Sequence, residues 1–63
     1  MRNRYEVICK SDGSLVAYIH GKDLKQVRLF YKYVTDPNIY PRVQDVTFRF
    51  LGKTKCNWIF ERI

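Results

Sequence analysis

Apolar and polar residues alternate in two early stretches of the chain, and this pattern predicts a β-hairpin. Residues 4–10 and 15–21 are rich in β-branched and aromatic types, which favour strands. Asp12 and Gly13 lie between them, and an Asp-Gly pair suits the positive φ angles of a type I′ turn. A two-residue loop gives the register Cys9 opposite Val16, Val7 opposite Tyr18, and Tyr5 opposite His20. Both faces of this hairpin carry apolar residues, so the pattern leaves open which face is buried.

The hydrophobic period then changes to that of a helix. Apolar residues recur at spacings of three and four, and the predicted stripe consists of Leu24, Val27, Phe30, Tyr31 and Val34. Asp23 is the predicted N-cap, and Gln26, three residues later, completes an acidic version of the capping box. Pro37 disfavours a helical conformation in the residue before it, so the helix should end near residues 35–36. Residues 36–42 are predicted to form a loop.

The C-terminal part predicts a second hairpin, formed by residues 43–51 and 55–62 around a loop at residues 52–54. The register that collects the apolar residues is Phe50 opposite Cys56, Phe48 opposite Trp58, and Val46 opposite Phe60. A slip of one residue would place Phe48 opposite Asn57 and spoil this face. The face is expected to pack against the helix through Leu24, Val27, Tyr31 and Val34.

The order of elements is therefore ββαββ, within a single small domain over residues 1–63. The economical arrangement is an α+β fold, a four-stranded antiparallel sheet with one helix packed on one face. Hydrophobic residues make up 46% of the chain and ten side chains are aromatic. Because each buried aromatic removes about 150–250 Å² from water, a few of them can hold so small a core.

Two cysteines, Cys9 and Cys56, are fewer than a small secreted scaffold usually carries. We expect both to be reduced in a soluble, cytoplasmic protein; a disulfide between them is the alternative if their strands are neighbours. Two cysteines and one distant histidine form no zinc signature, and no metal or cofactor is expected. No basic-then-apolar leader opens the chain, and no apolar run approaches the roughly 20 residues needed to cross a bilayer.

The net charge of +6 is concentrated around the predicted helix. Lys25, Arg28 and Lys32 fall within about 60° of one another at roughly 100° per residue, with Lys22 beside them. A solvated helix face usually mixes signs, because oppositely charged pairs four residues apart add stability. This face carries no acid, which suits contacts with phosphates, although a solvated charged face is the ordinary alternative. The predicted nucleic-acid-binding residues are Lys22, Lys25, Arg28 and Lys32, with Lys53 and Lys55 of the second turn as secondary candidates.

A different set of residues suggests contact with a protein. Four apolar side chains are expected to lie outside the core: Leu29, Tyr33, Ile39 and Tyr40. With the basic helix, they would suit an acidic protein surface. Small stand-alone proteins are common in phages and mobile elements, so an inhibitor of that type, which binds and blocks a host protein, is the alternative function. A homodimer is a third alternative.

Candidate catalytic residues are few. His20 is the only histidine and is expected near Tyr5, with no nucleophile or carboxylate placed beside it by a motif. The three glycines form no phosphate-binding loop. The sequence therefore predicts no catalytic site. It favours a small, basic, non-enzymatic protein that engages nucleic acid through phosphates with little sequence specificity.

Overall fold

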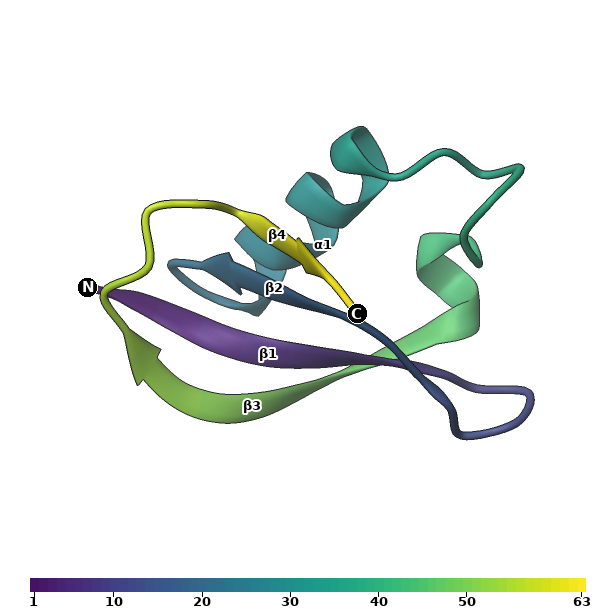
Figure 1. The fold of residues 1–63 in the computed structure, drawn as a ribbon, viewed down its shortest axis with the longest axis horizontal. Coiled ribbons are helices and arrows are strands. Elements are labelled where there is room, and N and C mark those ends of the chain that lie inside the picture. Colours follow the sequence, from purple (N-terminus) through teal and green to yellow (C-terminus); the bar gives the residue numbers. More distant parts are fainter.

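The computed structural model describes residues 1–63 and has one helix packed across one face of a four-stranded antiparallel sheet (Figure 1). The predicted α+β fold is confirmed. The elements are β1 (Arg2–Cys9), β2 (Leu15–Gly21), α1 (Leu24–Val34), a 3₁₀ turn η1 (Val43–Asp45), β3 (Val46–Thr54) and β4 (Phe60–Arg62). The strand predicted from residue 43 therefore starts three residues later, after η1.

The strand order is β3-β1-β2-β4, so the predicted second hairpin is wrong. β3 pairs with β1 over eight residues, and β4 pairs with β2. Residues 55–59 carry the chain from one edge of the sheet to the other, past the N-terminus (Figure 1). Lys53 therefore lies in a strand opposite Asn3, not at a turn. Trp58 is 53% exposed and does not face Phe48.

The predicted register of the first hairpin is also wrong, by one residue. Tyr5 pairs with Ile19, and Val7 pairs with Ala17. All four are buried, so this is the face beneath α1. Since side chains alternate between the faces of a strand, a shift of one residue exchanges the two faces of β2. His20 is thereby carried to the opposite face from Tyr5.

The register differs because four residues, 10–13, lie between Cys9 and Ser14, and because the pairing shifts by one residue between Val7 and Ile8. Gly13 has φ 74° and donates its N–H to the Cys9 carbonyl oxygen at 2.8 Å. The Asp12 carboxylate accepts the Ser14 N–H at 2.9 Å and the Ser14 hydroxyl at 2.7 Å. These two bonds stabilise the carboxylate and hold the pKa of Asp12 below its usual value. The bond from the Ser14 backbone N–H has the larger effect. Asp12 and Gly13 thus form the turn as predicted, but within a wider loop.

The helix begins where the sequence predicts. Asp23 is the N-cap, and its carboxylate accepts the Gln26 N–H at 2.9 Å. Val27 and Tyr31 are fully buried, whereas Leu24 and Val34 are exposed. The buried stripe is therefore narrower than predicted. The helix packs on β2, and no second hairpin extends beneath its outer positions.

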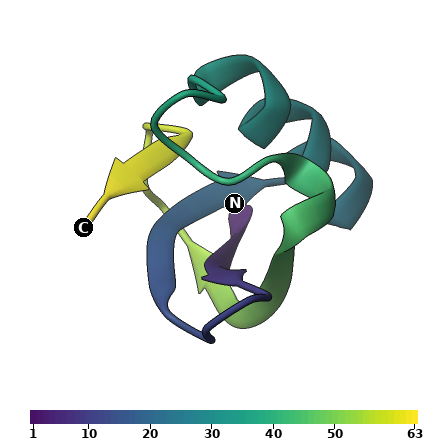
Figure 2. The same ribbon diagram turned by 90° about the vertical axis from the view of Figure 1, so that its right-hand side faces the viewer.

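Tyr31 ties the helix to both the core and the following loop. Its ring meets Phe48 and Phe60 with centroid separations of 5.6 and 6.4 Å. Its hydroxyl donates to the Pro41 carbonyl oxygen at 2.6 Å. This bond ties the segment between α1 and η1 to the helix; the segment loops outward from the end of α1 and then turns back into η1 (Figure 1 and Figure 2).

Gly21 allows the helix to approach β2 closely, which yields a stability prediction. A Cβ at this position would lie 2.6 Å from Cγ1 of the buried Val27. Gly21→Ala should therefore cost about 1–3 kcal/mol of unfolding free energy through overpacking, measured by urea unfolding. Exposed Lys22→Ala, one residue away, is the control and should change stability by less than about 0.5 kcal/mol. An unchanged midpoint for Gly21→Ala would contradict the close approach.

Tyr31→Phe tests the tether. Loss of the bond to Pro41 should cost about 1 kcal/mol at neutral pH. Burial raises the pKa of Tyr31 to about 12 from 10.0. The neutral phenol therefore contributes stability that is complete below pH 10 and is lost as the pH rises through 12. The advantage of the wild type over Tyr31→Phe should narrow between pH 10 and 12 in urea unfolding; a difference that stays constant over this range would contradict it.

Candidate polyanion-binding furrow

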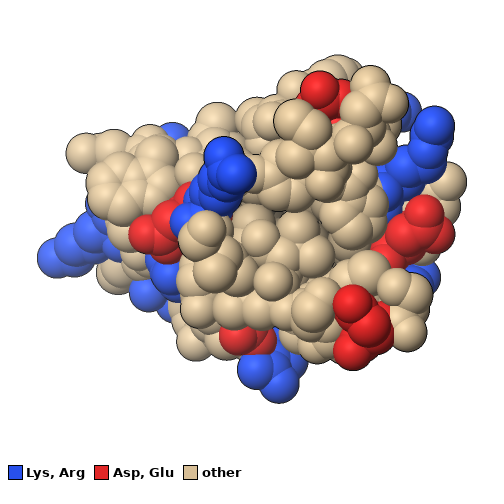
Figure 3. All heavy atoms as spheres, turned by 45° about the vertical axis from the view of Figure 1, so that its right-hand side comes forward, with Lys and Arg blue, Asp and Glu red and all other residues tan.

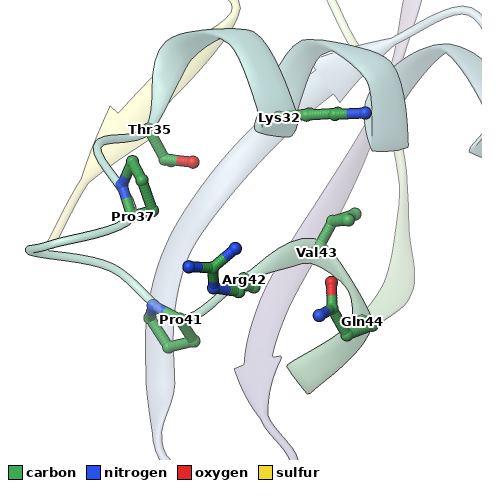
Figure 4. A pocket seen from close by; sticks show the side chains of 7 residues that line it. All are labelled: Lys32, Thr35, Pro37, Pro41, Arg42, Val43 and Gln44. Atoms are coloured by element: carbon green, nitrogen blue, oxygen red, sulfur yellow. The ribbon is translucent and has the colours of Figure 1, made fainter.

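Two adjoining hollows run between α1 and the segment that follows it. The first is lined by Lys25, Arg28, Leu29, Lys32 and Val43. The second is lined by Lys32, Thr35, Pro37, Pro41, Arg42, Val43 and Gln44 (Figure 4). Because the hollows share Lys32 and Val43, they form one depression, which we call the α1–η1 furrow. The Tyr31–Pro41 hydrogen bond holds its two sides together.

Four cations line the furrow and no acid does. Lys25, Arg28 and Lys32 come from α1, and Arg42 comes from the loop before η1. In Figure 4 the Arg42 side chain extends between the end of the helix and η1, on the opposite side of the depression from Lys32. Lys25 and Lys32 are seven residues apart, so their backbone positions are separated by about 10 Å along the helix axis. The result is a row of positive charge along one depression.

These four cations are unpaired. The two ion pairs of the structure join Arg4 to Glu61 and Arg49 to Glu6, both outside the furrow. The side chains of these four residues make no hydrogen bond within the chain. Arg28 has its guanidinium carbon 6.0 Å from the centre of the Phe48 ring, a contact that leaves its N–H groups free. Their charge is therefore available to a ligand.

Five of the six acids are engaged in local interactions, and the sixth, Asp45, is exposed in η1 next to the furrow residue Gln44. Asp12, Asp23 and Asp36 each accept a nearby backbone N–H in a turn or cap. Glu6 and Glu61 pair with arginines on the sheet face that α1 leaves open. On the face seen in Figure 3, acidic and basic groups lie next to one another around a largely uncharged centre. The surface charge is therefore mixed there and of a single sign in the furrow.

The structure brings together part of the predicted basic set. Lys25, Arg28 and Lys32 share one hollow. Lys22 is exposed just before α1 but does not line the furrow. Arg42 belongs to the site and was missed, because its place beside α1 depends on the path of the loop and on no local motif.

The two secondary lysines lie at a different place from the one predicted. Lys53 is in β3, opposite Asn3 near the start of β1. Lys55 follows β3 and lines a separate hollow with Arg2 and Cys56. The basic hairpin tip was therefore a wrong prediction, since β3 and β4 are not paired with each other.

Of the four apolar residues predicted to contact a protein, only one lines the furrow. Leu29 is exposed and lines the furrow beside the cations. Tyr33 and Ile39 are 77% and 70% exposed. Tyr40 is only partly exposed, because its ring packs edge-on against Phe60 with centroids 5.6 Å apart.

His20 is buried, and its surroundings differ from those predicted. Its Nε2 atom lies 2.9 Å from Nη1 of Arg4, and its Nδ1 atom lies 2.9 Å from the Trp58 carbonyl oxygen. Since a guanidinium only donates, Nε2 accepts and Nδ1–H donates to the carbonyl. Both ring nitrogens are thus engaged, and the bond from Nδ1 holds Trp58 to the sheet.

The remaining chemistry-bearing groups are dispersed. Cys9 and Cys56 are free; Cys9 ends β1, whereas Cys56 lies beside Arg2 at the start of that strand. No three His, Cys, Asp or Glu side chains gather in an arrangement that would hold a metal ion. The helices lack the length and apolar character that crossing a bilayer requires.

No protein-family model, curated protein or solved structure matches this chain. The proposal below therefore rests on the geometry and charge of the furrow.

Proposed function

We propose that this chain is a non-enzymatic binding protein that holds nucleic acid by its phosphate backbone in the α1–η1 furrow. The observation that carries the proposal is the set of four unpaired cations along one depression that no acid lines. Phosphate contacts of this kind release condensed counterions and carry little sequence information. Weak sequence preference is therefore expected.

Electrostatics and helix geometry support a phosphate ligand. Cations three and four residues apart repel mildly along one helix face, and a bound polyanion would relieve this repulsion. Arg28 and Arg42 offer planar forks that suit phosphate oxygens, while Lys25 and Lys32 offer compact charges. Three of the four cations stand on a helix, so their spacing is fixed before binding.

The openness of the furrow supports a polymer over an enclosed small molecule. Both of its hollows are open to solvent. Small-molecule sites usually bury most of their ligand. A backbone laid along the surface needs no such enclosure.

The environment of His20 supports a binding role over catalysis. The ring is fully buried and both nitrogens are hydrogen-bonded within the fold. A general base must reach the proton that it abstracts from a substrate. A ring in this position is better suited to holding the chain than to proton transfer.

The dependence of affinity on salt tests the furrow directly. With four phosphates contacted on duplex DNA, the logarithm of affinity against the logarithm of salt concentration should have a slope of about −3.6. Arg28→Gln should make this slope shallower by about 0.9, because it removes one phosphate contact. The measurement is fluorescence anisotropy of a labelled duplex between 50 and 200 mM salt.

Arg62→Gln is the matched control, since Arg62 is exposed on β4, at the edge of the sheet opposite β3. It removes the same charge and should leave the slope nearly unchanged. Equal effects of Arg28→Gln and Arg62→Gln would show that net charge, and not the furrow, determines binding. A wild-type slope near zero would refute the proposal.

An acidic protein surface is the second candidate ligand of the same face. The supporting observation is that Leu29 is exposed within the furrow, beside Lys25, Arg28 and Lys32. Tyr33 lies one helical turn further on and is also exposed. An apolar anchor surrounded by cations is typical of protein interfaces. An inhibitor that blocks a host protein through this face would use these two side chains.

The double variant Leu29→Ala/Tyr33→Ala separates the two candidates. Both residues are exposed, so the fold should keep its stability to within about 1 kcal/mol. If a protein is the ligand, capture of it from nuclease-treated lysate should be lost in this variant. Capture that is nuclease-sensitive and unchanged in the variant would instead refute the protein candidate.

A further inference from the structure

Trp58 is the largest side chain that the fold leaves uncovered on an anchored loop. It was expected opposite Phe48 in the core, but 53% of it is exposed, between β3 and β4. It is the single tryptophan of the chain. Exposure of a large aromatic surface to water costs free energy, and such surfaces are typical of sites that a ligand or partner covers.

The backbone beneath this indole is anchored at three consecutive carbonyl groups. The Asn57 oxygen accepts from Nη1 of Arg2 at 2.9 Å. The Trp58 oxygen accepts from the His20 ring at 2.9 Å and more weakly from Arg2 at 3.4 Å. The Ile59 oxygen accepts the His20 N–H at 2.7 Å. The loop is therefore fixed while its indole is exposed, so little ordering entropy remains to be lost on binding.

Positive charge surrounds the start of this loop. Arg2, whose guanidinium contacts the loop, lines a hollow of about 350 Å³ together with Lys55 and Cys56. No acid lines this hollow. Trp58 does not line this hollow, but its chain neighbour Asn57, whose carbonyl oxygen accepts from Arg2, does. Arg2, Lys55 and Trp58 together make up what we call the Trp58 platform.

We infer that the Trp58 platform binds single-stranded nucleic acid by stacking an unpaired base on the indole while the adjacent cations hold its phosphates. The inference rests on the proposed function and adds a substrate class to it. Base stacking on aromatic side chains combined with backbone cations is the usual basis of single-strand binding. Bases within a duplex are already stacked, so an exposed indole gains no such contact there. The furrow binds either form, and the platform adds affinity for the single strand.

The fluorescence of Trp58 tests this inference in the unmodified protein. Titration with a 20-nucleotide single strand should quench the tryptophan emission as the complex forms. A duplex of the same length should bind, as seen by anisotropy, with little quenching. Inorganic polyphosphate, a polyanion without bases, should compete for the cations without quenching. Equal quenching by polyphosphate and by the single strand would overturn the inference.

Substitutions at Trp58 supply the second measurement. Trp58→Ala should weaken single-strand affinity about tenfold and leave duplex affinity unchanged. Trp58→Phe, which keeps an aromatic face, should restore most of the loss. The anchoring carbonyls belong to the backbone and remain in both variants, and thermal unfolding checks that both are folded.

The outcomes distinguish this inference from the proposed function. Binding of both nucleic acids with a steep salt dependence, but without quenching or an effect of Trp58→Ala, would overturn the platform and keep the furrow. Loss of single-strand affinity alone in Trp58→Ala, with rescue by Trp58→Phe, supports the platform. Failure of the wild type to bind either form would overturn both.

Discussion

The position of Tyr31 determines most of what this fold presents to solvent. The side chain is fully buried against two phenylalanine rings, and its hydroxyl reaches the Pro41 carbonyl oxygen. The ring contacts pack α1 against the sheet. The hydroxyl bond ties the following loop to the helix. Arg42, the next residue after Pro41, is thereby brought to the depression that Lys32 also lines. A core residue thus helps to assemble a surface feature, together with Tyr40, which packs on Phe60 and holds the same loop.

The distribution of charge gives this surface its character. Turns and caps occupy three aspartates, and two arginines of the open sheet face take up both glutamates. Because these acids are committed locally, the net charge of +6 is not averaged over the surface. The cations of α1 and Arg42 face a depression without acids, and those near the start of β1 lie beside an exposed indole. Backbone binding and base stacking require these two kinds of surface.

Local signals in the sequence predicted local structure well. The Asp23 cap, the extent of α1 and the shared face of Lys25, Arg28 and Lys32 all depend on residues within one or two turns of each other. The pairing of β3 with β1 joins residues 37 to 52 positions apart, and no short-range pattern encodes it. The predicted hairpin between the last two strands placed its apolar side chains on one face, so the local pattern gave no reason to reject it. The same nonlocal pairing explains why Trp58 was assigned to the core, whereas Arg42 was missed because its position depends on the path of the loop after α1.

The decisive question is whether ligand binds in the α1–η1 furrow. It can be answered by following the amide chemical shifts of ¹⁵N-labelled protein during titration with a short oligonucleotide. The largest changes are predicted at residues 25–32 of α1 and 41–44 of the adjoining segment. The open sheet face around Glu6 and Arg49, whose charges are already paired, should change little. Shifts concentrated on that open face, with those of α1 unchanged, would contradict the account.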